Sequence, residues 1–437
     1  MRFGIALTAI LAVALVIRFA WSSWTDPIPL PLSDPNYYNA TALSLARGEG
    51  YSVVLDAKRG FLPGGEATAF WPPGYPAFLA VFYRLFGESA DVAKAANAFA
   101  GALAVVPIYF IGLRFFGRPT ATVGAAIAAG LPSLVFWVPV LYSDTLFTLL
   151  FATTVALLLY AVRPDRSFNP ILVVIGGVAL GTAALVRGQA LVLVPVVVAY
   201  WALAGAKPAK CLLWGCGALA VALVAIAPWS IRNVKAMKSP ILLSANMGYN
   251  LRIGHAPYST GRYIVPQDLW DAKPEIITFK EREPVFNDLG TDRAIKYALG
   301  HPGEEVVLTV RKVLSLWQPD SDALIWVSSY GLTPLPEGAW EPLRWALESS
   351  YVALLVLVGY GLLRVRSCFP QLAFLIILIL VWTATHIVFF GEPRYHLPVL
   401  AVMVPVAAAP LVWLWQGFRR IPVSWQQRRS VATRDRI

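Results

Sequence analysis

The chain has 437 residues, of which 57% are hydrophobic and only 14% are charged, and its mean hydropathy is +0.61. Soluble domains have roughly 45–50% apolar and about 25% charged residues. The apolar residues also gather in runs of about 17–25, the length that a helix needs to cross roughly 30 Å of hydrocarbon. These properties exclude a soluble enzyme and predict an all-α polytopic membrane protein.

The net charge of +11 arises from 36 basic and 25 acidic side chains. In a soluble chain this excess would suggest binding to nucleic acid, but in membrane proteins Lys and Arg accumulate in cytoplasmic loops. Membrane topology therefore explains the charge, and we expect no nucleic-acid partner.

Ten apolar runs predict about ten transmembrane helices. The first run follows Arg2 and lacks a small-residue cleavage site, so we expect an uncleaved first helix rather than a signal peptide. The runs cover residues 3–20, 92–114, 119–138, 143–162, 170–186, 189–205, 210–229, 349–363, 370–390 and 395–416.

The charges orient these spans. With the N-terminus inside, the cytoplasmic loops and tail carry 15 Arg and Lys residues against two acids, while the long segments 21–90 and 230–345 face outward. We therefore expect a plasma (inner) membrane protein with both termini in the cytoplasm. The predicted organisation is an N-terminal module of seven spans (1–230) with its first outer loop (21–90), a large extracytoplasmic loop (231–348), three C-terminal spans (349–416) and a basic tail (417–437).

The first outer loop contains a candidate functional carboxylate. Apolar residues three and four apart in residues 36–46 predict an amphipathic helix on the membrane surface that ends at Gly48, and Asp34 lies just before it. Either Ser33 or Asp34 could serve only as the helix N-cap. A loop rich in glycine follows at residues 60–65, and a second amphipathic run ends at Gly87.

Charged residues also mark the predicted outer ends of the spans. They are Asp144, Arg187, Arg232 and the turn that contains Glu392, Arg394, Tyr395 and His396. One such arginine could simply extend its charge to the membrane surface. All of these residues fall on the same side, however, which favours a site for an anionic lipid headgroup with a carboxylate beside it.

Four motifs resemble those of the PMT/ArnT-like branch of the GT-C membrane glycosyltransferases. The resemblance runs from about residue 20 to residue 410. The first motif is Ser33-Asp34-Pro35-Asn36-Tyr37-Tyr38, and the second is Trp71-Pro72-Pro73-Gly74-Tyr75-Pro76. The third has two parts, Ala227-Pro228-Trp229-Ser230-Ile231-Arg232-Asn233 and Asn246-Met247-Gly248-Tyr249-Asn250-Leu251-Arg252-Ile253-Gly254. The fourth is Pro393-Arg394-Tyr395-His396-Leu397-Pro398.

The resemblance implies a GT-C-type fold with amphipathic juxtamembrane helices in the first outer loop and a large outer loop after the seventh span. It also implies an inverting transferase that takes one sugar from a polyprenyl-phosphate-linked donor at the extracytoplasmic face. Asp34 is then the expected general base, and the expected ligands of the donor phosphate are Arg187, Arg232, Arg252 and Arg394. Candidate contacts to the acceptor or sugar are Tyr37, Asp144, Asn246, Tyr249, Glu392, Tyr395 and His396.

The expected partners are the sugar donor, membrane lipid and a glycan, lipid or protein acceptor. Many relatives have two adjacent acids in the first loop, whereas Pro35 follows Asp34 here, so we expect a single carboxylate base. The four histidines show no ligand spacing, and we predict no metal site. The expected reaction does not require a divalent cation, but the sequence is also compatible with one.

The main alternative is a transporter or flippase of lipid-linked sugars. Such a protein would also need outward arginines, but its typical pair of helices broken by Gly or Pro in corresponding halves is missing from the sequence.

In the large outer loop, the apolar spacing of residues 291–317 predicts one or two helices that lie on the membrane surface.

Overall fold

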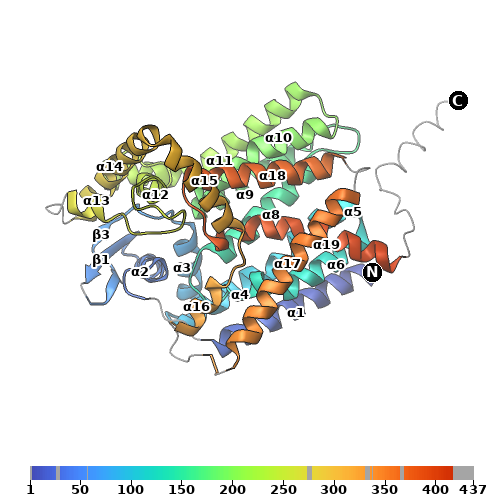
Figure 1. The fold of residues 1–437 in the computed structure, drawn as a ribbon, viewed down its shortest axis with the longest axis horizontal. Coiled ribbons are helices and arrows are strands. Elements are labelled where there is room, and N and C mark those ends of the chain that lie inside the picture. Colours follow the sequence, from blue (N-terminus) through green and yellow to red (C-terminus); the bar gives the residue numbers. More distant parts are fainter. Residues whose placement is uncertain are drawn as a thin grey trace.

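The computed structural model describes residues 2–25, 30–56, 58–272, 278–329, 335–336, 338–364 and 369–416. The predicted basic tail, 417–437, lies outside these residues. The apolar helices form one bundle, and the elements of the two outer segments gather at one end of it (Figure 1). The N-terminus lies at the opposite end of the bundle.

Seven helical segments in the described part of the chain are long and apolar enough to cross a membrane, and two further apolar helices are shorter. The fold is therefore that of an all-α polytopic membrane protein, as the sequence predicts. The bundle helices are α1 (Arg2–Trp24), α4 (Ala90–Leu103), α5 (Val105–Phe116), α6 (Arg118–Gly130), α8 (Asp144–Ala161), α9 (Pro170–Val186), α10 (Leu193–Leu203), α11 (Pro208–Met237), α17 (Trp340–Arg364), α18 (Phe369–Val388) and α19 (Leu397–Trp415).

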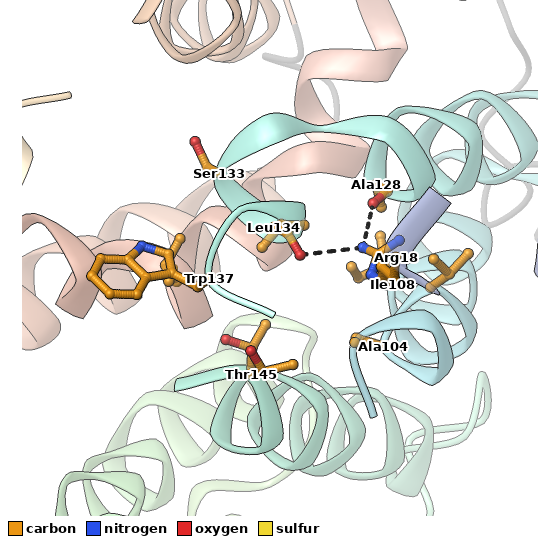
Figure 2. Close-up of a pocket in the computed structure, with 12 residues that line it drawn as sticks. Arg18, Ala104, Ile108, Ala128, Ser133, Leu134, Trp137 and Thr145 are labelled. Atoms are coloured by element: carbon orange, nitrogen blue, oxygen red, sulfur yellow. Dashed lines mark hydrogen bonds between the residues drawn. The ribbon is translucent and has the colours of Figure 1, made fainter. Parts of the chain in front are cut away.

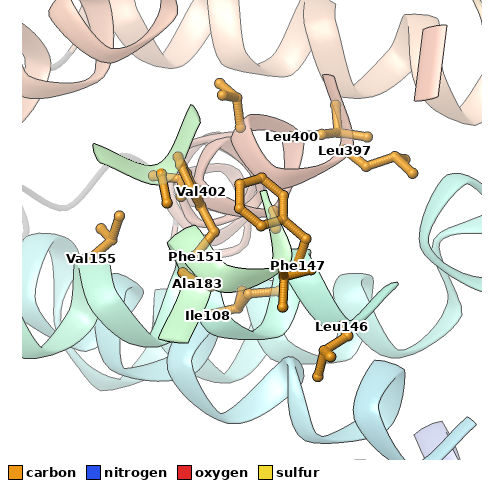
Figure 3. Packing of buried hydrophobic residues seen from close by; sticks show 14 of the residues in the cluster. Ile108, Leu146, Phe147, Phe151, Val155, Ala183, Leu397, Leu400 and Val402 are labelled. Atoms are coloured by element: carbon orange, nitrogen blue, oxygen red, sulfur yellow. The ribbon is translucent and has the colours of Figure 1, made fainter. Parts of the chain in front are cut away.

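Helices α8 and α19 form the centre of the bundle. Of their membrane windows, 72% and 83% of the residues are buried, against 17–61% for the other candidate spans. Figure 3 shows Phe147 and Phe151 of α8 packed beside Leu397, Leu400 and Val402 of α19. The outer ends of both central helices lead into the candidate site, because α8 begins at Asp144 and α19 follows the turn that contains Arg394.

The apolar run 119–138 is not one continuous helix. Helix α6 ends at Gly130, and a single turn, α7 (Pro132–Val135), follows. The interruption arises because Pro132 has no N–H and disfavours a helical residue before it. At 1.5 Å per residue, α6 is only about 20 Å long, shorter than the hydrocarbon core.

Arg18 of α1 satisfies the carbonyl groups at this break. Its guanidinium donates to the carbonyls of Ala129 at 2.8 Å, Ala128 at 3.1 Å and Leu134 at 3.4 Å, and the side chain is fully buried (Figure 2). These bonds compensate both the buried charge and the unpaired helix-end carbonyls. Arg18 is thus a structural residue of the bundle.

The first outer segment contains two helices and a small sheet. Helices α2 (Asp34–Arg47) and α3 (Gly74–Phe86) confirm the two predicted helical runs. The region interpreted as a loop instead forms an antiparallel sheet of order β2-β1-β3, built from β1 (Ser52–Asp56), β2 (Gly60–Pro63) and β3 (Glu66–Ala67). The alternation of apolar and polar residues in these short strands is a weak signal, and three glycines interrupt it, Gly60 at the start of β2 and Gly64 and Gly65 in the turn after it.

The second outer segment is mostly helical and covers the end of the bundle. Its elements are α12 (Met247–Gly254), α13 (Gln267–Ala272), α14 (Phe279–Gly300), α15 (Pro302–Trp317) and α16 (Asp322–Ser329). Helices α14 and α15 confirm the helices predicted within 291–317. Helix α15 packs against α18 and the short 3-10 helix η3 (Pro393–His396), which precedes α19.

Candidate active site

A cavity of about 590 Å³ lies between the outer ends of the spans and the two outer segments. Its bundle side is formed by the end of α9, the 3-10 helix η1 (Gly188–Val192), the end of α18 and η3. Its outer side is formed by the start of α2, residues 71–72, residues 239–250 and one turn of α14. The charged lining residues are Asp34, Arg187, Asp288 and Arg394.

Asp34 is the first residue of α2, and its carboxylate is not used as the helix cap. Ser33 is the N-cap, since its hydroxyl accepts the backbone N–H of Asn36 at 3.3 Å. The side-chain amide of Asn36 bonds both the N–H and the carbonyl of Phe61 in β2, at 2.7 and 3.1 Å. These bonds fix the start of α2 against the sheet and leave Asp34 at the cavity wall.

The environment of Asp34 favours a proton-accepting role. Burial raises the pKa of this carboxyl, and the guanidiniums of Arg394 and Arg187 oppose the rise by favouring the charged form. The side chain is 29% exposed, so it remains accessible from the cavity. A carboxylate with a raised pKa is a stronger base than an exposed one.

Arg394 lies between two carboxylates. Its Nη2 is 3.6 Å from Oδ2 of Asp34, and its Nη1 is 3.7 Å from Oδ2 of Asp144. The guanidinium also stacks over the ring of Tyr142 at 3.9 Å, and its side chain is only 13% exposed. These contacts hold the cation in place at the cavity wall.

Arg187 forms the second cationic group. Its Nη2 donates to Oδ2 of Asp144 at 2.6 Å and its Nε donates to the hydroxyl of Ser143 at 3.0 Å. The guanidinium lies 5.2 Å from the ring centre of Tyr395, which also lines the cavity. Asp144 is fully buried and does not line the cavity, so it contacts both arginines on their side away from the cavity and orients them.

This arrangement suits an anion attached to a lipid. Two fixed guanidiniums can donate to one phosphate. Apolar side chains on the same cavity wall, including Val186, Val192 and Phe389, offer a surface for a hydrocarbon chain. Asp34 beside them can take a proton from a hydroxyl group.

Arg232 lies outside the cavity lining and bonds the backbone instead. Its Nη2 donates to the carbonyl of Tyr51 at 2.6 Å, and its Nη1 donates to the carbonyl of Thr68 at 2.7 Å. Tyr37, also outside the lining, meets the same loop, because its hydroxyl lies 2.5 Å from Oγ1 of Thr68. Arg232 thus joins α11 to the first outer loop, and Tyr37 joins α2 to the segment after β3 within that loop.

Arg252 also lies away from the cavity. It pairs with Asp268 at 3.1 Å and donates to the carbonyl of His255 at 2.9 Å, so it links α12 to the segment that follows it. Tyr249 packs its ring against Phe70. Neither residue lines the cavity.

Of the remaining candidates, only Asn246 and Tyr395 line the cavity. Glu392 pairs with Arg262 at 3.0 Å and accepts the N–H of Tyr263 at 2.8 Å. His396 is fully buried, and its Nδ1 bonds the carbonyl of Leu316 at 2.8 Å. The structure thus brings together Asp34, Arg187, Arg394, Asn246 and Tyr395 at one cavity, with Asp144 behind them.

Several polar lining residues were not among the sequence candidates, including Gln189, Asn250, Asn287 and Asp288. Gln189 lies two residues after Arg187, a proximity that could have indicated it. Asn287 and Asp288 lie in the middle of the polar helix α14, where no local pattern distinguishes them. In the described part of the chain, no group of three or more His, Cys, Asp or Glu side chains is placed to hold a metal ion.

Residues 71–231 match the model of a family described as dolichyl-phosphate-mannose-protein mannosyltransferase. This segment includes Asp144 and Arg187. Comparison with curated protein sequences returns no match.

The fold is similar to that of AglB, the oligosaccharyltransferase of Archaeoglobus fulgidus, solved with an inhibitory peptide and a dolichol-phosphate. The TM-score is 0.55 at 15% identity, over 94% of this chain and 51% of that one. The chain thus spans about half the length of AglB. ArnT from Cupriavidus metallidurans, bound to undecaprenyl phosphate, matches with a TM-score of 0.45 at 17% identity, over 93% of this chain and 78% of that one.

The family match covers residues 71–231, less than half of the chain, and the fold match to AglB covers nearly all of it. Both findings agree with the resemblance of the four sequence motifs to the PMT/ArnT-like branch of the GT-C membrane glycosyltransferases, and the match to AglB shows a similar fold.

Proposed function

We propose that the protein transfers a single sugar from a polyprenyl-phosphate-linked donor to an acceptor hydroxyl, with inversion at the anomeric carbon. The observation that carries this proposal is the single cavity lined by Asp34, Arg187 and Arg394 at the end of an apolar bundle. A base, a binding site for an anionic leaving group and an apolar wall are the parts that such a reaction needs.

In this proposal Arg187 and Arg394 bind the donor phosphate. Both guanidiniums are fixed by Asp144, and both retain N–H groups that make no bond to it. AglB, which shares the fold, was solved with a dolichol-phosphate, which supports a polyprenyl phosphate as the lipid carrier. The apolar wall is then the place where the carrier chain leaves the cavity.

Asp34 is the proposed general base. The oxygen of the acceptor hydroxyl forms a bond to the anomeric carbon as the bond from that carbon to the phosphate oxygen breaks, and the hydroxyl proton passes to Asp34. The electron pair of the broken bond remains on the polyprenyl phosphate, where the two arginines stabilise the added negative charge. A single displacement inverts the anomeric configuration.

We place this site at the extracytoplasmic face of the plasma membrane. Helix α2, which begins at Asp34, and the outer segments lie at the end of the bundle opposite the N-terminus, and the basic residues of the sequence assign that terminus to the cytoplasm (Figure 1). The acceptor reaches the cavity from outside and is a glycan, a lipid or a protein hydroxyl.

The purified protein in detergent tests this function with a panel of polyprenyl-phosphate sugars. We expect release of polyprenyl phosphate together with transfer or hydrolysis of the sugar, and a product of inverted configuration. The same protein in proteoliposomes tests the transporter alternative. Movement of an intact lipid-linked sugar across the bilayer without cleavage of its phosphate bond would contradict a transferase.

A further inference from the structure

The polar lining of the cavity divides into two chemically different parts. The bundle side carries the two arginines, and Asp34 lies beside Arg394 at the start of α2, whereas the rest of the outer side carries neutral amides and one carboxylate. We call this outer part the amide wall, and it consists of Asn246, Asn250, Asn287 and Asp288. The proposed mechanism uses none of these residues.

Local structure brings the amide wall together. Asn246 is the N-cap of α12 and Asn250 lies four residues later, so the two side chains lie on the same side of this helix. Asn287 and Asp288 come from α14, and Oδ1 of Asn287 accepts the backbone N–H of Gly248 at 3.0 Å.

Two glycines make this contact between α12 and α14 possible. A Cβ at Gly248 would lie 1.8 Å from the carbonyl oxygen of Asn287, and a Cβ at Gly290 would lie 2.4 Å from the carbonyl oxygen of Gly248. No side chain fits at these distances, so the two helix backbones approach each other only because both positions are glycine. The motif that begins at Asn246 therefore supplies two residues of the amide wall, Asn246 and Asn250, and through Gly248 it also allows α14 to pack close enough to complete the wall.

The amide wall has unused hydrogen-bonding groups. Asn250 is half-buried and lines the cavity, and its side chain bonds no other residue in the described part of the structure. Asn246 is 4% exposed; its Oδ1 accepts the hydroxyl of Ser244 at 2.8 Å, while its Nδ2 has no partner among the described residues. Buried polar groups of this kind normally have a partner.

We propose that the amide wall binds the hydroxyl groups of a sugar ring and selects a neutral, polyhydroxylated sugar over an acidic one. This inference rests on the proposed transferase function. A side-chain amide offers both donors and an acceptor, which matches neighbouring hydroxyls, and the Asp288 carboxylate accepts further hydroxyl protons. Because the wall contains no Lys or Arg, a sugar carboxylate would meet Asp288 without a compensating cation.

The ring bound there belongs either to the donor or to a glycan acceptor, and binding measurements separate the two. The probes are bare undecaprenyl phosphate and undecaprenyl phosphates that carry a neutral hexose, a neutral pentose or a hexuronic acid, each added to the purified full chain. The variants are Asn250→Ala and Asn246→Asp, which replaces the unpaired amino group at nearly constant size. Gln267→Ala is the control, because Gln267 is an exposed amide of the same outer segment and does not line the cavity.

If the wall binds the donor sugar, Asn250→Ala weakens binding of the best neutral sugar lipid about tenfold and leaves the affinity for bare undecaprenyl phosphate unchanged. If it binds a glycan acceptor, donor binding and hydrolysis stay at the native level, and the variant raises KM for the acceptor. In the first case the native protein also prefers neutral donor sugars to the hexuronic acid, and in the second it prefers neutral glycan acceptors to acidic ones.

The inference is overturned if both variants bind and transfer like the Gln267→Ala control, or if the hexuronic acid is the preferred substrate. Failure of the underlying function looks different, because the native protein would then cleave no polyprenyl-phosphate sugar. Loss of bare undecaprenyl phosphate binding in Asn250→Ala would also contradict the inference, since it would place this residue at the phosphate.

Discussion

Arg394 and Asp34 form an ion pair at the cavity wall, with Nη2 of the arginine 3.6 Å from Oδ2 of the aspartate. One residue precedes the last apolar helix and the other opens the first outer helix, so folding brings together residues that are far apart in the sequence. The pair is long for a salt bridge, and a donor phosphate could compete with the carboxylate for the guanidinium. The relationship links the proposed base directly to the proposed phosphate site.

Replacing Arg394 should weaken binding of the donor phosphate. We expect Arg394→Ala to raise the Kd for undecaprenyl phosphate by at least about tenfold, because a hydrogen bond to a charged group contributes about 1.5–3 kcal/mol. Equilibrium binding to the purified protein measures the effect. Arg59→Ala is the matched control, since Arg59 is an exposed arginine of the first outer loop that does not line the cavity. Equal affinities in the two variants would remove Arg394 from the phosphate site.

The pKa of Asp34 predicts the acid limb of the rate profile. Burial raises this pKa, and a base must be ionised, so the transfer rate should fall with decreasing pH at a value above the usual Asp pKa of about 3.9. Arg394 lowers the same pKa, and its removal in Arg394→Ala should therefore move the acid limb to higher pH. The measurement is kcat against pH at saturating donor. A limb that stays in place in this variant would contradict the coupling.

Arg232 should act on stability rather than on donor binding. Its guanidinium donates to two backbone carbonyls, those of Tyr51 and Thr68. Arg232→Ala leaves these carbonyls unpaired, at a cost of about 1–3 kcal/mol each where they are buried. We expect a lower thermal unfolding temperature and, in the folded fraction, native affinity for undecaprenyl phosphate. A large loss of that affinity without loss of stability would return Arg232 to the phosphate site.

The comparison of Arg232 with Arg394 shows what the sequence can and cannot predict. Both arginines follow the same local signal, a charged residue at the outer end of an apolar span. The contacts that separate them come from distant segments, since Arg232 bonds the first outer loop while Arg394 faces Asp34 and Asp144. Local patterns therefore place such residues at the ends of the apolar spans without revealing their partners.

Elements with strong local signals were predicted well. Helix α2 was predictable because Ser33 and Gly48 mark its two ends. Seven described helical segments are long and apolar enough to span, while the count of about ten spans stays a prediction. The β-strands around Gly60 and the contribution of Asn287 to the cavity were missed. Both depend on tertiary contacts, namely the bonds of Asn36 to Phe61 and the close packing of α12 on α14.

Glu283 should make stability depend on pH. This buried carboxylate of α14 accepts the N–H of Ala69 at 2.7 Å and bonds the hydroxyl of Thr68, and burial raises its pKa from 4.5 to about 7. The folded protein therefore binds the proton more tightly than the unfolded chain, so this contribution to stability is lost as pH rises from about 4.5 to about 7.

Glu283→Gln tests this dependence, because the amide keeps an acceptor for Ala69 and supplies a donor for Thr68 without titrating. From pH 5 to pH 8, the free energy of unfolding should fall more in the native protein than in the variant. The difference should be about 1 kcal/mol or more if the pKa shift exceeds one unit. Thermal unfolding at each pH measures it. Parallel curves for the two proteins would contradict the assignment.

The most direct test of the central claim compares Asp34→Asn with Asp56→Asn, a second aspartate of the first outer loop that does not line the cavity. The measurement is the initial rate of sugar transfer or donor hydrolysis, with undecaprenyl phosphate binding and thermal unfolding as checks that each variant is folded. General-base catalysis usually contributes 10²–10⁴, so we expect Asp34→Asn to lose at least about a hundredfold in kcat while Asp56→Asn retains the native rate. A folded Asp34→Asn protein that turns over within about tenfold of the native rate would show that Asp34 is not the base.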